Sequence, residues 1–167
     1  ALPAAQAAFV AGYMAHLLVD EIWYYRIFDP FFSQGRPDDP PIQRRLFYHN
    51  ALRLYCEDSL MDAVAEEYVD ALAGSSAHYD FPLFSDAVLE VWRDRISAEM
   101  RPGASRRSAE VFAERMHIPV EELLLLVRDP QTLQATVLSR LPAGLLAQMQ
   151  AAAIEQAGQL TWRYLAG

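Results

Sequence analysis

Apolar residues recur at intervals of three and four along almost the whole chain, and alternating runs of β-branched residues do not occur. This spacing places apolar side chains on one face of an α-helix. The pattern therefore predicts an all-α fold without a sheet. Clusters of proline and glycine divide it into about seven helices, a single-domain helical bundle that covers residues 1–167.

The boundaries of the predicted helices follow from helix breakers. The first helix spans about residues 3–27 and stops before Pro30, which lacks the N–H that an α-helix needs. The second begins near Pro41 and continues, with a bend near Ser59, to Gly74. The remaining five are expected at residues 85–100, 105–116, 118–129, 130–141 and 142–167.

Composition narrows the class of protein. A chain of 167 residues with 53% hydrophobic residues is expected to form a packed globule. Its net charge is −8 and all 14 of its basic residues are arginine, so it would repel a phosphate backbone and we expect no nucleic-acid partner. The single Cys56 excludes an internal disulfide and indicates a reducing compartment, the cytoplasm. Cys56 itself is expected to be a small core residue.

The first stretch of the chain raises a membrane span as an alternative, because residues 1–19 are almost entirely apolar. His16 lies inside this stretch, however, and no basic residue flanks it. A buried core helix is therefore favoured, with no transmembrane span and no signal peptide. The chain begins at Ala1 rather than at methionine, so either processing or a missing N-terminal segment is expected.

His16 and Asp20 are the first candidates for chemistry, because residues four apart share one face of a helix. Imidazole nitrogen and carboxylate oxygen are both zinc ligands, and this spacing lets them converge on one ion. Gly12 lies one turn earlier and leaves room for a ligand or another helix. The alternative is a polar pair that fixes packing in the core. Both interpretations predict that Asp20 faces inward.

A second cluster lies on the second predicted helix, where His49, Arg53 and Glu57 lie roughly on one face. If the first two helices are antiparallel, His49 comes near the level of His16 and Asp20 and supplies a third metal ligand. Arg53 either contacts a phosphate or neutralises Asp20. The alternative is that His49 is a surface or capping residue.

The other histidines and the tryptophans are expected to be structural. His78 lies in a predicted loop, and His117 ends a predicted helix, where the helix dipole favours a histidine. Large aromatic side chains are more often core residues than a substrate platform. The core is therefore expected to hold Trp23, Trp92 and Trp162.

The stretch "AFVAGYMAHLLVDEIWYYRIFDPFF" resembles the bacterial zinc-dependent phospholipase C family. In that family an HxxxD motif ligates zinc, and His16 and Asp20 match it. The resemblance implies an all-helical fold and phosphodiester hydrolysis at a zinc cluster. The chain departs from the pattern in three respects. It starts with alanine where the enzymes use an N-terminal tryptophan, it has only four histidines, and it lacks a second HxxxE motif.

These observations leave two functions to be tested. One is a metal-dependent hydrolase of a phosphoester small molecule or lipid headgroup. It would hold zinc at His16, Asp20 and His49, with Arg53 near the phosphate. The other is a non-catalytic helical protein with a degenerate metal site, acting through protein–protein contacts that include a homo-oligomer. In a third interpretation the HxxxD spacing is merely structural, in an unrelated bundle.

Overall fold

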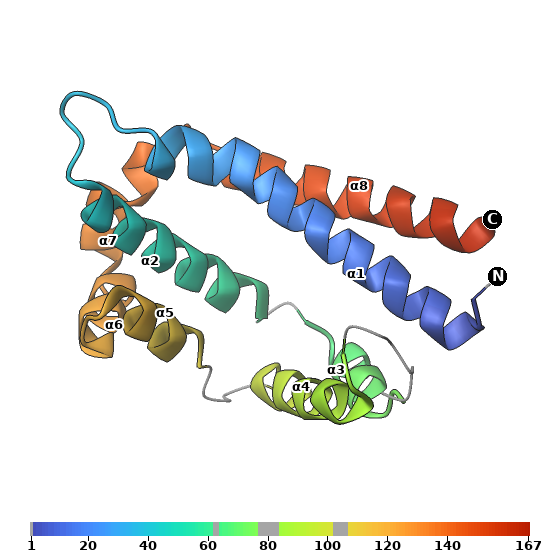
Figure 1. Ribbon diagram of the computed structural model, residues 1–167. Helices are drawn as coiled ribbons and strands as arrows, with labels where there is room; N and C mark the ends of the chain where they lie inside the picture. The colour runs from blue at the N-terminus through green and yellow to red at the C-terminus, as the bar shows by residue number, and fades with distance from the viewer. Residues whose placement is uncertain (1, 62–63, 77–83, 102–106) are drawn as a thin grey trace. The chain divides into compact units, whose positions relative to one another are not determined.

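The computed structural model describes residues 2–61, 64–76, 84–101 and 107–167 (Figure 1). The chain is 80% helix, and no strand occurs among the described residues, which confirms the all-α prediction. Where about seven helices were expected, the described residues form eight α-helices, a π-helical segment and a short 3₁₀ turn. No helix within those ranges is long and apolar enough to cross a membrane.

The chain divides into two compact units. The first comprises Ala1–Asn50 and Arg128–Gly167, and the second comprises Ala51–Val127. Helix α2 (Ile42–Met61) begins in the first unit and ends in the second. Each unit has its own buried apolar residues, so each is described by itself.

The first unit is built on an antiparallel pair of long helices, α1 (Ala4–Trp23) and α8 (Leu145–Ala166). The two lie side by side, with the N- and C-termini at the same end of the pair (Figure 1). Gly144 precedes α8 in a left-handed conformation (φ 77°) that other residues rarely adopt, which lets the chain turn sharply into the helix. The pair buries few side chains completely: Ala11, Ile22, Met149 and Ala153.

The sequence predicts that the first helix stops before Pro30, but the helical path continues through this residue. It continues as a π-helix, η1 (Tyr24–Ser33), with Pro30 inside it. In an α-helix the proline ring meets the carbonyl four residues earlier. The wider π-helical turn pairs residues five apart and moves that carbonyl away from the ring. The helical path therefore extends far enough to bury Ile27 and Phe32.

Arg45 of α2 holds the end of the π-helix. Its guanidinium donates hydrogen bonds to the backbone carbonyls of Phe32 (3.0 Å), Ser33 (2.9 Å) and Pro40 (2.9 Å). A Cβ on Gly35 would lie 2.9 Å from Nη1 of Arg45, so the loop can close over the guanidinium because residue 35 is glycine. One side chain thus satisfies carbonyl groups on both sides of the loop.

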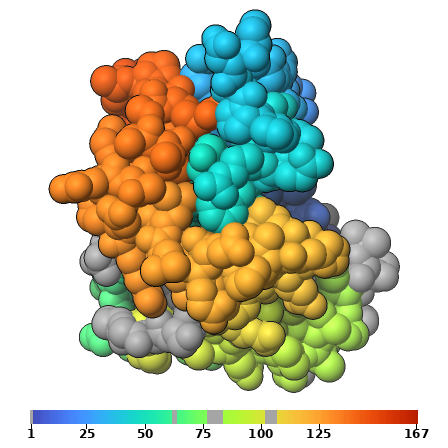
Figure 2. All heavy atoms as spheres, turned by 90° about the vertical axis from the view of Figure 1, so that its left-hand side faces the viewer, coloured from blue at the N-terminus to red at the C-terminus, as the bar shows by residue number. Residues whose placement is uncertain are grey.

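The same loop is tied to the segment after α7 (Pro130–Thr136). Arg140, at the end of the 3₁₀ turn η2 (Leu138–Arg140), donates a hydrogen bond to Asp39, and the two segments meet on the face shown in Figure 2. The backbone N–H of Arg36 and the Arg140 guanidinium both lower the pKa of Asp39. Asp39 is therefore an anion at neutral pH, which keeps this ion pair intact.

The second unit contains the last part of α2 and four shorter helices. Ser108 donates a hydrogen bond to Glu57 of α2 (2.9 Å). Arg101 forms an ion pair with Asp70 (2.9 Å). The four helices are α3 (Glu66–Ala73), α4 (Asp86–Glu99), α5 (Ser108–Met116) and α6 (Val120–Arg128), whose last residue belongs to the first unit.

The helix boundaries of the second unit agree only in part with those predicted from the sequence. Ser85 caps α4, its Oγ accepting a hydrogen bond from the N–H of Val88 at 3.4 Å. The second predicted helix is in fact two, because α2 ends at Met61 and α3 begins at Glu66. Most of the predicted irregular connection at residues 75–84, with His78, and the predicted helix start at Ser105 lie outside the described residues.

We expect Arg45→Lys to lower the free energy of unfolding by roughly 1–3 kcal/mol, because a single ammonium group cannot make the three hydrogen bonds of the guanidinium fork. Chemical denaturation followed by circular dichroism measures the change. Arg163→Lys, at an exposed position of α8 in the same unit, is the matched control and should change stability by less than about 0.5 kcal/mol. Equal effects of the two substitutions would contradict the anchoring role of Arg45.

Candidate functional site

The side chains of His16 and Asp20 are in contact on α1, with 3.3 Å between Nε2 and Oδ2. This confirms that the HxxxD spacing brings the two side chains together. The prediction that Asp20 faces inward is wrong, because the side chains of His16 and Asp20 are 65% and 66% exposed. The physical reason is that the α1 face that packs on its neighbours is the opposite one, which buries Ala11 and Ile22.

His49 is held among aromatic side chains at the end of α1. Its Nε2 accepts a hydrogen bond of 2.9 Å from Nε1–H of Trp23. Its ring lies 4.7 Å from that of Phe28 and 5.4 Å from that of Phe32, between centroids. A nitrogen that accepts a hydrogen bond uses its lone pair, so His49 cannot offer Nε2 to a metal ion while this bond is made.

The part of α1 that His49 of α2 faces explains which side chains it contacts. The antiparallel arrangement predicted for the first two helices does bring α2 beside the end of α1. His49 lies next to Trp23 and the π-helix, rather than one turn earlier at Asp20. The sequence signal for this contact is the aromatic run that follows Asp20.

Arg53 lies in the second unit, where its guanidinium stacks over the ring of Phe112 at 4.4 Å. Such a contact is a cation–π interaction that holds α2 against α5. The proposed ligands His16, Asp20 and His49 all belong to the first unit. Within the described ranges, no group of three or more histidine, cysteine, aspartate or glutamate side chains is arranged to hold a metal ion.

Cys56 is a buried residue of the second unit, as predicted, with 7% of its surface exposed. Burial raises the pKa of its thiol to about 11. The thiolate is the nucleophilic form, so the group is protonated and inert at neutral pH. Cys56 is therefore a packing residue rather than a catalytic one.

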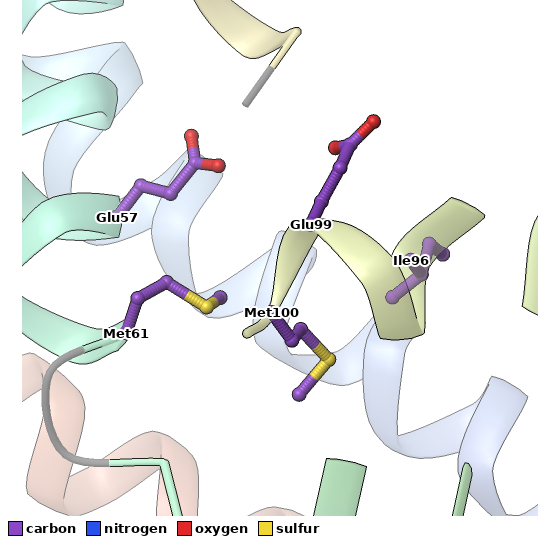
Figure 3. Close-up of a pocket in the computed structure, with 5 residues that line it drawn as sticks. All are labelled: Glu57, Met61, Ile96, Glu99 and Met100. Atoms are coloured by element: carbon purple, nitrogen blue, oxygen red, sulfur yellow. The ribbon is translucent and has the colours of Figure 1, made fainter. Parts of the chain in front are cut away.

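A hollow of about 170 Å³ in the second unit was not anticipated from the sequence. Figure 3 shows Met61 of α2 reaching toward Met100, which follows α4. One carboxylate oxygen of Glu99 is buried there and accepts no hydrogen bond from the described residues, with Nε of Arg95 3.7 Å away. Two carboxylates and two thioethers are too few hard ligands for a metal site. The lining residues are Glu57, Met61, Ile96, Glu99 and Met100.

Besides this hollow, the structure has an exposed apolar surface that the sequence did not predict. The structure corrects the core assignment of two tryptophans, because Trp92 is 52% and Trp162 is 75% exposed. Trp162 lies on α8, and further large apolar residues of α1 and α8 are exposed with it. Counting apolar residues could not reveal this, since both helices are apolar on more than the face that packs. These residues are Tyr13, Leu17, Val19, Ile154 and Leu165.

No protein-family model, no curated protein and no solved structure matches this chain.

We expect Cys56 to react slowly with a thiol reagent at pH 8 and rapidly once the protein is unfolded in denaturant, because burial removes both access and thiolate. Raising the pH toward 11 should speed the reaction and also destabilise the fold, because the stabilisation from a raised thiol pKa is complete below the unfolded-state pKa and is lost as the pH rises through the folded-state value of about 11. A colorimetric thiol assay measures both. Rapid labelling of the native protein at pH 8 would contradict the buried assignment.

Proposed function

We propose that the protein is a non-catalytic helical interaction module that binds partner proteins through the open faces of the α1–α8 pair. The observation that carries this proposal is the exposure of large apolar side chains on helices that bury almost nothing fully. Tyr13 and Leu17 of α1 are 46% and 49% exposed, and Ile154 of α8 is 73% exposed. Exposed apolar surface of this kind is typical of protein–protein contact sites.

The charge distribution supports the same function. Residues 4–19 of α1 carry no aspartate, glutamate or arginine, and the 22-residue α8 carries only Glu155 and Arg163. A helix that faces only water normally has a charged outer face. Covering such a surface removes apolar area from water at about 25 cal/mol per Å² and desolvates few charges. The pair is therefore suited to pack against other helices.

The mode of binding follows from the spacing of the exposed residues along α1. Tyr13, His16, Leu17 and Asp20 share one exposed face of α1, by their helical spacing. Amphipathic partner helices bind such faces through residues at positions i, i+3, i+4 and i+7. The His16–Asp20 pair adds a polar element that a partner must satisfy, which gives specificity.

A selection from a displayed library of helix-forming peptides tests this function, with the full chain as bait. We expect amphipathic helical peptides to be enriched. We also expect Leu17→Arg to weaken their binding at least tenfold, because it places a charge in the apolar face. Gln43→Arg, which places the same charge at an exposed position of α2 outside the α1–α8 pair, is the matched control and should retain binding. Enrichment of no helical peptide, or equal binding by Leu17→Arg, would contradict the proposal.

The zinc-dependent phospholipase C-like hydrolase is the leading function predicted from the sequence, and the HxxxD pair is what favours it. A catalytic zinc site needs three protein ligands and an open position. If His16 and Asp20 belong to such a site, the purified chain carries at least one zinc ion and Asp20→Asn releases it. Elemental analysis of both proteins measures this, with Asp58→Asn as a control carboxylate outside the motif. A wild-type chain without zinc would remove the hydrolase function.

A further inference from the structure

Helix α8 has three distinct faces. One packs within the first unit and buries Met149 and Ala153. A second is polar and carries Glu155 and Gln159, which are hydrogen-bonded to each other at 3.1 Å. The third is an exposed apolar stripe, whose six members all have exposed side chains or, at the glycine, exposed backbone. The α8 stripe consists of Ala147, Ala151, Ile154, Gly158, Trp162 and Leu165.

The members of the α8 stripe follow one another at intervals of four, three, four, four and three residues. At 100° per residue they fall within an arc of about 80°. Steps of three and four residues are typical of a coiled-coil seam, the narrow apolar line along which two helices meet. Neither charged residue of α8 is a member of the stripe: Arg163 lies far from it around the helix, and Glu155 lies at its edge, hydrogen-bonded to Gln159 on the polar face.

The sizes of these residues change along the helix in a way that fits a second α8 running in the opposite direction. The N-terminal half of the stripe carries the small Ala147 and Ala151, and the C-terminal half carries the large Trp162 and Leu165. No atom lies within 4 Å of a Cβ built on Gly158, so the space there is open.

We propose that the α8 stripe binds the α8 stripe of a second copy of this chain, antiparallel, about a two-fold axis near residue 156. Ala147 then lies opposite Leu165 of the other copy, and Ile154 fills the space over its Gly158. Trp162 meets Ala151 in the same way. Every large side chain faces a small one, which is the self-complementarity that a two-fold interface requires. A parallel pair would instead crowd two tryptophans together and leave a void between alanines.

The size of the contact sets the expected affinity. A helix of 22 residues is about 33 Å long. Two such stripes with one tryptophan each bury on the order of 1,000 Å² in total, near the lower limit for a specific protein interface. The dimer is therefore expected to dissociate in the micromolar range. This inference rests on the proposed interaction function and names the partner of one of its two helices.

Sedimentation equilibrium of the full chain from about 1 to 300 μM tests the proposal. The wild-type protein should shift with concentration from its monomer mass of 18.9 kDa to twice that mass. Gly158→Leu should weaken the dimer at least tenfold, because the new side chain occupies the space of the opposing Ile154. The monomer should remain folded, since the space around Gly158 is open and leucine is the better helix former.

Gln159→Leu is the matched control. It introduces the same residue one position along, on the polar face of α8, and should leave the dimer unchanged. Trp162→Gln, at a side chain that is 75% exposed, provides a second disruptive variant should Gly158→Leu fail to fold, and thermal denaturation by circular dichroism reports folding for each.

The double substitution Ile154→Ala with Gly158→Leu tests the direction of the helices. In the antiparallel pair it exchanges the large and small partners and should restore the dimer. In a parallel pair, residue 158 faces residue 158 and no rescue follows. A dimer that Gly158→Leu leaves intact, or a double variant that is not rescued, would overturn the proposed interface.

A wild-type chain that stays monomeric at every concentration would also overturn the self-association. So would a monomer whose tryptophan fluorescence shifts to shorter wavelength on phosphatidylcholine vesicles in the wild-type protein but not in Trp162→Gln, which would assign the stripe to a lipid surface. Neither result touches the peptide selection on Leu17, so failure of the dimer and failure of the interaction function remain separate outcomes.

Discussion

The three hydrogen bonds from Arg45 to the carbonyls of Phe32, Ser33 and Pro40 determine how the first unit is assembled. The end of a helix leaves carbonyl groups without partners, and here the chain must also turn toward α2. A guanidinium has five donors in a planar fork, so one residue can serve carbonyls on both arms of the turn. Because this anchor sits at the start of α2, it determines which residues of α2 meet the end of α1.

The aromatic cluster around His49 follows from that anchor. His49 lies one turn after Arg45 and on the same side of α2, so it comes to rest beside Trp23, Phe28 and Phe32. The indole N–H of Trp23 would be costly to bury alone, and Nε2 of His49 accepts its hydrogen bond. A histidine that looked available as a metal ligand is thus engaged by the contact that joins the two helices.

The helical content and most helix boundaries could be predicted from sequence, because spacing, proline and capping residues act locally. The continuation through Pro30 could not, since proline excludes the α-helical hydrogen bond but not the wider π-helical turn. The spacing of His16 and Asp20 predicted their contact, yet not their exposure. Which face of an apolar helix is covered depends on distant segments, and for the same reason Trp162 was wrongly assigned to the core.

The open faces of the two long helices of the first unit differ in polarity, and this difference separates their roles. The open face of α1 includes the polar side chains of His16 and Asp20, which would lose their hydration if a second α1 covered them. The stripe on α8 includes no charged or hydrogen-bonding side chain apart from the indole N–H of Trp162, at its edge. Self-association through α8 therefore costs little desolvation. A partner on α1 must instead supply groups that satisfy an imidazole and a carboxylate, so α1 is the face on which different partners can be distinguished.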